Sequence, residues 1–115
     1  MTRPETSQHF LYLSLSVWGE SKRRAVVEAT TASKLLNRVL DAYLQQAPTG
    51  HPAQRARAGD LLEIFERRSV HLENSTWQAV KVRADLENRS VSAIAEQLLR
   101  QYLGMPALEP ETPQN

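Results

Sequence analysis

The stretch RSVHLENSTWQAVKVRADLENRSVSAIAEQLLRQYL, residues 68–103, sets the architecture because its hydrophobic period changes along its length. It opens with apolar side chains at alternate positions, Val70 and Leu72, which is typical of a half-buried strand. We expect the strand at residues 70–73 and a helix near residues 75–88. The apolar positions of that helix recur at helical spacing and are Trp77, Val80 and Ala84.

The rest of the stretch predicts a second, more strongly amphipathic helix. Ser90 is a favourable N-cap, and Gly104 and Pro106 supply the residue types that end helices. The apolar stripe between them recurs at i, i+1, i+4 and i+5. Its members are Ile94, Ala95, Leu98, Leu99, Tyr102 and Leu103.

The same pattern occurs earlier in the chain. Residues 9–44 fit over residues 68–103 at an offset of 59 without a gap, and the two tryptophans of the chain, Trp18 and Trp77, coincide. The aligned unit predicts a strand at residues 11–14, a helix near residues 16–30 and a helix capped by Thr31. Further identical pairs are Leu13/Leu72, Ser16/Ser75, Lys22/Lys81, Arg24/Arg83, Ala25/Ala84, Glu28/Glu87, Ser33/Ser92, Leu40/Leu99, Tyr43/Tyr102 and Leu44/Leu103. The chain therefore contains a duplicated unit of 36 residues.

One such unit cannot fold alone, because its single strand has no partner for its backbone and its length is too short to enclose a core. Two units complete each other. We therefore predict a mainly α fold with a two-stranded antiparallel β-ribbon, in the order β-α-α-linker-β-α-α, whose units share one core as a pseudo-dimer.

The expected boundaries follow from this organisation. Residues 1–8 are a flexible N-terminus, 9–46 the first unit and 67–104 the second. The linker covers residues 47–66 and ends in a short helix at 60–66, and residues 105–115 form a disordered, acidic and proline-rich tail.

Composition excludes several classes of protein. The chain has no cysteine, which excludes disulfides and thiolate metal sites, and no apolar run of membrane-spanning or signal-peptide length. We therefore expect a cytoplasmic location. His9, His51 and His71 lie too far apart in sequence to indicate a metal site. No phosphate-binding glycine loop or Ser/His/Asp set is present, so we expect neither enzyme activity nor a cofactor.

The charge distribution is compatible with a nucleic-acid partner. The whole chain carries a net charge of +1, but residues 9–103 hold 13 Lys or Arg against 10 Asp or Glu, a net charge of +3.

The order of strand, Trp77 helix, Asn88-Arg89-Ser90 and apolar stripe resembles the ribbon-helix-helix superfamily of Arc, MetJ and CopG repressors. The stretch Lys81-Val82-Arg83-Ala84 followed by Arg89-Ser90 is also similar to Arc-like antitoxins. The tandem arrangement is similar to the TraY group of conjugation proteins. The resemblance covers about two-thirds of the chain, and the first unit departs from it at Thr30-Thr31.

The resemblance implies that outward ribbon side chains contact DNA bases in the major groove and that the start of each second helix contacts phosphates. Arg67 is the best candidate for a guanine contact. The implied base-reading residues are Arg67, Ser69 and His71 in the second unit and Gln8, Phe10 and Tyr12 in the first. The implied phosphate-binding residues are Arg89, Ser90, Val91 and Ser92, and Thr31, Ser33 and Lys34.

The leading function is therefore sequence-specific binding of double-stranded DNA at an asymmetric site. Such a protein acts as a transcriptional repressor or as an accessory factor in plasmid partition or transfer. It is a monomeric pseudo-dimer that can assemble further on DNA. One alternative is an antitoxin-like or other protein-interaction module that uses residues 105–115 or the aromatic face of Phe10 and Tyr12. Another is a structural interaction domain that has lost DNA binding.

Overall fold

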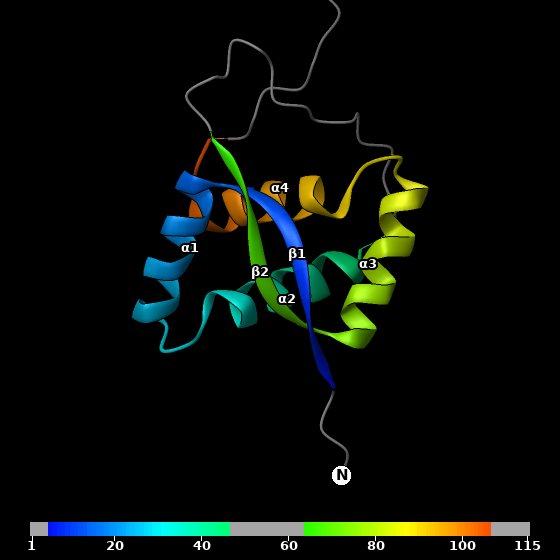
Figure 1. Ribbon diagram of the computed structural model, residues 1–115, viewed down its shortest axis with the longest axis horizontal. Helices are drawn as coiled ribbons and strands as arrows, with labels where there is room; N and C mark the ends of the chain where they lie inside the picture. The colour runs from blue at the N-terminus through cyan, green and yellow to red at the C-terminus, as the bar shows by residue number, and fades with distance from the viewer. Residues whose placement is uncertain (1–4, 47–63, 107–115) are drawn as a thin grey trace, which may run out of the picture.

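The computed structural model describes residues 5–46 and 64–106 and contains the expected elements in the expected order (Figure 1). These are β1 (Thr6–Ser14), α1 (Leu15–Val27), α2 (Ala32–Leu44), β2 (Phe65–Glu73), α3 (Asn74–Leu86) and α4 (Val91–Leu103). The predicted β-α-α repeat and its two-stranded antiparallel sheet are confirmed. The ribbon crosses over α2 and α4, with α1 and α3 on its two sides.

The strands pair about an approximate two-fold axis. Phe10 lies opposite Ser69, its own counterpart at the offset of 59, so the axis passes between these two residues. The ends of the ribbon close in the same way. The Leu15 N–H donates to the Ile64 carbonyl over 2.9 Å, and the equivalent Asn74 N–H donates to the Glu5 carbonyl over 2.8 Å.

The strands are longer than the sequence predicts. β1 begins at Thr6, so residues 6–8 belong to the fold rather than to a flexible end. β2 begins at Phe65, so residues 65 and 66 are extended where a short helix was expected, while residues 60–63 of that helix lie outside the described residues. Hydrogen bonds from the partner strand extend each strand past its apolar residues. The local sequence alone does not predict this extension, because strand formation depends on the neighbouring strand.

The first helix of each unit is shorter than expected. α1 ends at Val27 and α3 at Leu86 because Ala29 and Asn88 adopt left-handed backbone conformations, with φ of 56° and 54°. The predicted N-caps of α2 and α4 are confirmed, since Thr31 Oγ1 accepts from Lys34 N and Ser90 Oγ accepts from Ala93 N. Gly104 ends α4 with φ of 71°.

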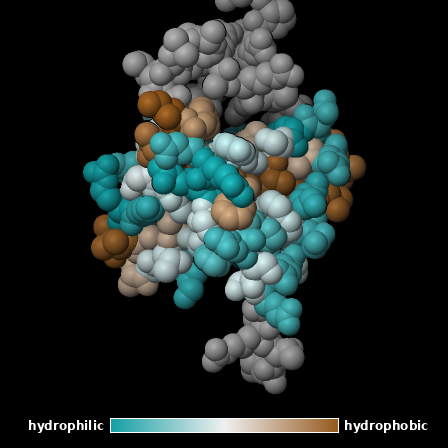
Figure 2. Space-filling view, in the orientation of Figure 1, coloured by the Kyte–Doolittle hydropathy of each residue, from teal (hydrophilic) through white to brown (hydrophobic). Residues whose placement is uncertain are grey.

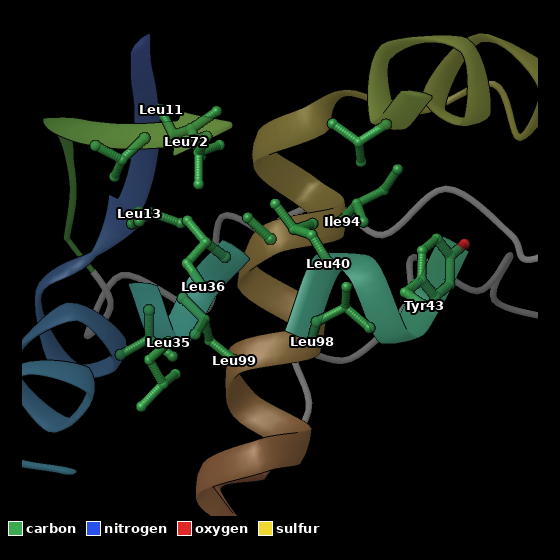
Figure 3. Packing of buried hydrophobic residues seen from close by; sticks show 14 of the residues in the cluster. Leu11, Leu13, Leu35, Leu36, Leu40, Tyr43, Leu72, Ile94, Leu98 and Leu99 are labelled. Atoms are coloured by element: carbon green, nitrogen blue, oxygen red, sulfur yellow. The ribbon is translucent and has the colours of Figure 1, made fainter. Parts of the chain in front are cut away.

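A single core lies beneath the ribbon and is built from both units (Figure 3). Leucines from the inner faces of β1 and β2 point toward leucines of α2 and α4. Trp18 and Tyr43 are buried, whereas their counterparts Trp77 and Tyr102 are half-buried. The fully buried members of the cluster include Leu11, Leu13, Leu35, Leu36, Leu40, Leu72, Ile94 and Leu99.

Side chains of the opposite unit cover the outer edges of the ribbon. Along β1, Ser92 Oγ accepts the N–H of Tyr12 over 2.9 Å, and Glu96 Oε1 accepts the N–H of Ser14 over 2.9 Å. Along β2, Ser33 Oγ and Asn37 Oδ1 accept the N–H groups of His71 and Glu73. The spacing of donors and acceptors matches. The accepting side chains are four residues apart on a helix, a rise of about 6 Å, and the donating N–H groups are two residues apart on a strand, a rise of about 6.6 Å. Each strand is therefore held on the second helix of the other unit.

None of the described helices is long and apolar enough to cross a bilayer.

Candidate nucleic-acid interface

The strand register brings the six expected base-reading residues together on the outer face of the ribbon. Leu11, Leu13, Val70 and Leu72 face the core, so the alternate positions face outward. All six outward side chains are exposed and form three cross-strand pairs. These pairs are Gln8/His71, Phe10/Ser69 and Tyr12/Arg67. Figure 2 shows that hydrophilic side chains gather over this side of the molecule.

Contacts within this face hold two polar groups in place. Gln8 Nε2 donates to Ser69 Oγ over 2.5 Å, and the Arg67 guanidinium lies 3.9 Å from the centre of the Phe10 ring. A guanidinium stacked on an aromatic ring keeps its outer N–H groups free to meet a planar acceptor. Phe10 remains 47% exposed and Tyr12 59% exposed, so both rings present apolar surface on the outer face of the ribbon.

The outward residues form two groups, one at each end of the ribbon, and each group contains residues of both units. Tyr12 and Arg67 form one end, and Gln8 and His71 form the other. Each end thus combines one strand from each unit. The two ends differ in chemistry because the approximate symmetry relates Tyr12 to His71 and Gln8 to Arg67.

The start of a helix lies beside each end of this face. Ser92 of α4 contacts the backbone of Tyr12, and Ser33 of α2 contacts the backbone of His71. The first N–H groups of a helix have no partner within it and carry the positive end of the helix dipole, which favours anions. The two helix starts and the ribbon therefore form one continuous surface.

The expected phosphate-binding side chains have different surroundings. Thr31 and Ser90 are exposed, but their hydroxyls cap their own helices. Ser33 and Ser92 turn their hydroxyls toward the ribbon edges, and Val91 is half-buried. Their backbone N–H groups remain the part of these residues that suits a phosphate. Lys34, in the first turn of α2, is exposed.

The Arg89 side chain is buried and hydrogen-bonded within the fold. Its side chain is 1% exposed. Its guanidinium donates to Glu87 Oε1 over 2.9 Å, to the Tyr43 hydroxyl over 2.7 Å and to Gln97. Burial raises the pKa of the Tyr43 hydroxyl, and its bond to Glu87 acts in the same direction. The pKa of Glu87 is lowered because hydrogen bonds from Tyr43 and Arg89 outweigh the opposing effect of burial. The start of α4 therefore lacks the exposed cation that Lys34 gives α2.

An open notch of about 360 Å³ lies between the start of α2 and the His71 end of the ribbon. It is lined by Thr6, Lys34, Asn37, Arg38, Asp41, His71 and Glu73. Thr6 extends the outward face by one position and is not among the residues that the sequence pattern predicts for this site. The repeat alignment gives the missing signal, since a ribbon centred on Phe10 and Ser69 pairs Thr6 with Glu73.

The fold and this surface define a tandem β-α-α protein with an exposed two-stranded ribbon flanked by two helix starts. Comparison with models of protein families, with curated proteins and with solved structures gives no match. Within residues 5–46 and 64–106, no three His, Asp or Glu side chains are grouped to hold a metal ion.

Proposed function

We propose that this chain is a tandem ribbon-helix-helix protein that binds double-stranded DNA by placing its β1–β2 ribbon in the major groove. The observation that carries the proposal is the continuous surface formed by the outer ribbon face and the starts of α2 and α4. The major groove admits a two-stranded ribbon, and flanking helix starts suit the phosphates on either side of it. In this role the chain acts as a repressor or as an accessory factor in plasmid partition or transfer.

The side chains on the ribbon suit recognition of base edges. Arg67 has the donor geometry for O6 and N7 of guanine, and Gln8 can donate to and accept from adenine. Tyr12 supplies a hydroxyl and Phe10 an apolar surface that fits a thymine methyl group. Because the two ends differ, the preferred DNA site is not a palindrome.

Salt dependence tests the proposal. We expect the chain to bind a random duplex at low salt, with the logarithm of the binding constant falling linearly as the logarithm of salt concentration rises. Fluorescence anisotropy of a labelled duplex gives both quantities. Absence of binding at low salt, or an affinity unchanged by salt, would contradict the proposal, because phosphate contacts release counterions.

A protein partner is the second candidate, and the exposure of Phe10 and Tyr12 favours it. Exposed aromatic side chains are common in protein interfaces. The tail proposed for such a partner is residues 105–115, of which residues 107–115 lie outside the described residues. Replacing Phe10 and Tyr12 with Ser separates the candidates. A DNA reader keeps salt-dependent binding to random duplex through its helix starts but loses preference for its specific site, because base contacts carry that preference. A protein-binding face loses its partner, and its DNA sequence preference does not change.

A further inference from the structure

Several contacts between the two units occur twice, once on each side of the approximate axis. The serine contacts to the ribbon edges are one such pair. Tyrosine contacts below them form another, because the Tyr43 hydroxyl donates to Glu87 and the Tyr102 hydroxyl donates to Glu28 over 2.6 Å. These repeated contacts do not distinguish one unit from the other.

The contact where each strand enters the following helix is built differently on the two sides. Where β1 enters α1, Ser14 donates through its N–H and its hydroxyl to the two carboxylate oxygens of Glu96, over 2.9 and 2.6 Å. Arg100 Nε donates to the same carboxylate over 2.7 Å. All three residues are at most 4% exposed. This side is a buried ion pair completed by a hydroxyl from the other unit.

The equivalent place, where β2 enters α3, contains no ion pair of this kind. The N–H of Glu73 donates to Asn37 Oδ1 over 2.9 Å. Asn37 Nδ2 donates to Asp41 Oδ2 over 3.1 Å, and the buried Thr76 hydroxyl donates to Asp41 Oδ1 over 2.7 Å. On this side, the amide of Asn37 and the carboxylate of Asp41 bind each other, and the Thr76 hydroxyl of the other unit completes the cluster.

The offset of 59 pairs four positions that all differ between the sides, namely Ser14/Glu73, Val17/Thr76, Asn37/Glu96 and Asp41/Arg100. We infer that these positions make the pairing surface selective. The partner that each unit fits is the other unit, in the same chain or in a second copy, and not a copy of itself. The inference concerns assembly and does not rest on DNA binding.

The exclusion of like pairs follows from hydrogen-bonding chemistry. If the second unit paired with itself, the Glu73 carboxylate would stand where the Ser14 hydroxyl donates to Glu96. Two acceptor-only carboxylates would then share one guanidinium, that of Arg100, in a buried place, twice per assembly.

A pair of first units also loses a contact on each side. Val17 would stand where Thr76 donates its hydroxyl to Asp41, so the carboxylate would meet methyl groups instead of a donor. Unlike pairing gives each of these carboxylates a hydroxyl donor, whereas each like pairing removes the donor that Glu96 or Asp41 has here.

Native mass spectrometry of the cut chain tests the inference. A protease site is placed between residues 47 and 63 of the full chain, the folded protein is cut, and the mixture is unfolded in urea and refolded. Both halves stay present throughout, and their masses differ. We expect complexes of one first unit with one second unit. A statistical mixture that includes like pairs would overturn the inference.

The matched variant makes both sides the same. The changes Asn37→Glu, Asp41→Arg, Glu73→Ser and Thr76→Val give each side the Ser14, Val17, Glu96 and Arg100 arrangement. We expect the cut variant to form like and unlike pairs together. If it still forms only unlike pairs, selectivity lies elsewhere and the inference fails. If this variant does not refold, the composition of the cut native chain alone supports or overturns the inference.

Discussion

Two exposed cations lie at opposite ends of the proposed DNA surface. We expect their removal to have different effects on DNA binding. Arg67 faces outward on the ribbon at the Tyr12 end, while Lys34 lies in the first turn of α2 beside the His71 end. A guanidinium can read a base edge, whereas an ammonium beside a helix start acts as a point charge on phosphate.

The matched substitutions Arg67→Gln and Lys34→Gln each remove one positive charge. We expect Arg67→Gln to abolish preference at one half of the site, with a loss of about 1–3 kcal/mol of discrimination there. Lys34→Gln should weaken binding to all sequences equally and reduce the salt slope by about 1. Anisotropy titrations on matched and mutated duplexes measure both effects.

Arg23→Gln is the control, because Arg23 is 77% exposed on α1 and pairs with Glu20. Equal effects of the Arg67 and Lys34 changes on specific and random DNA would show that the ends do not differ in role.

His9, in β1, should make the stability of the fold depend on pH. Its ring stacks on Trp77 with ring centres 4.0 Å apart, and its buried Nε2 has no hydrogen-bond partner among the described residues. Burial lowers the pKa of His9 below its ordinary value of 6.5, and the nearby charge of Lys81 lowers it further. The unfolded chain therefore takes up this proton more readily than the folded chain.

Stability should accordingly fall as pH drops through and below 6.5, and the contribution of His9 is fully present only above that value. We expect His9→Gln to flatten the dependence of the free energy of unfolding between pH 7.5 and 5.5, measured by urea denaturation. That range lies above the ordinary carboxylate pKa values. An identical slope in the variant would rule out His9 as the cause.

The helices show where sequence patterns predict structure well and where they do not. The stripes and caps of α2 and α4 were readable because one face is apolar and Thr31 and Ser90 occupy the N-caps. The end of α1 was not, because Ala29 is not a residue type that signals a left-handed turn, whereas α3 ends before Asn88, a residue type that does adopt this conformation. The side-chain partners of Arg89 were also hidden, since they come from three separate segments.

Replacing alanine with glycine should change the free energy of unfolding in opposite directions at Ala29 and at Ala42. A left-handed alanine costs about 1–2 kcal/mol, and the extra freedom of glycine in the unfolded chain offsets about 0.4–1 kcal/mol of the relief. Ala29→Gly should therefore raise the free energy of unfolding by about 0.5–1 kcal/mol. Ala42→Gly, at an exposed position within α2, should lower it by about 1 kcal/mol. Thermal denaturation compares them, and a loss of stability in Ala29→Gly would contradict the left-handed assignment.

The molecule as a whole has one core shared by both units, so neither unit should unfold separately. Trp18 and Trp77 report on different units. We expect Trp18→Phe and Trp77→Phe each to show coincident urea transitions by tryptophan fluorescence and far-ultraviolet circular dichroism. Separate midpoints for the two signals within one variant would indicate units that fold independently.

Selection of binding sites from a random pool of duplex DNA tests most directly whether the ribbon surface reads DNA. We predict enrichment of one non-palindromic sequence, with a guanine preference in one half that disappears in Arg67→Gln. Failure to enrich any sequence, or enrichment of a perfect palindrome, would contradict it.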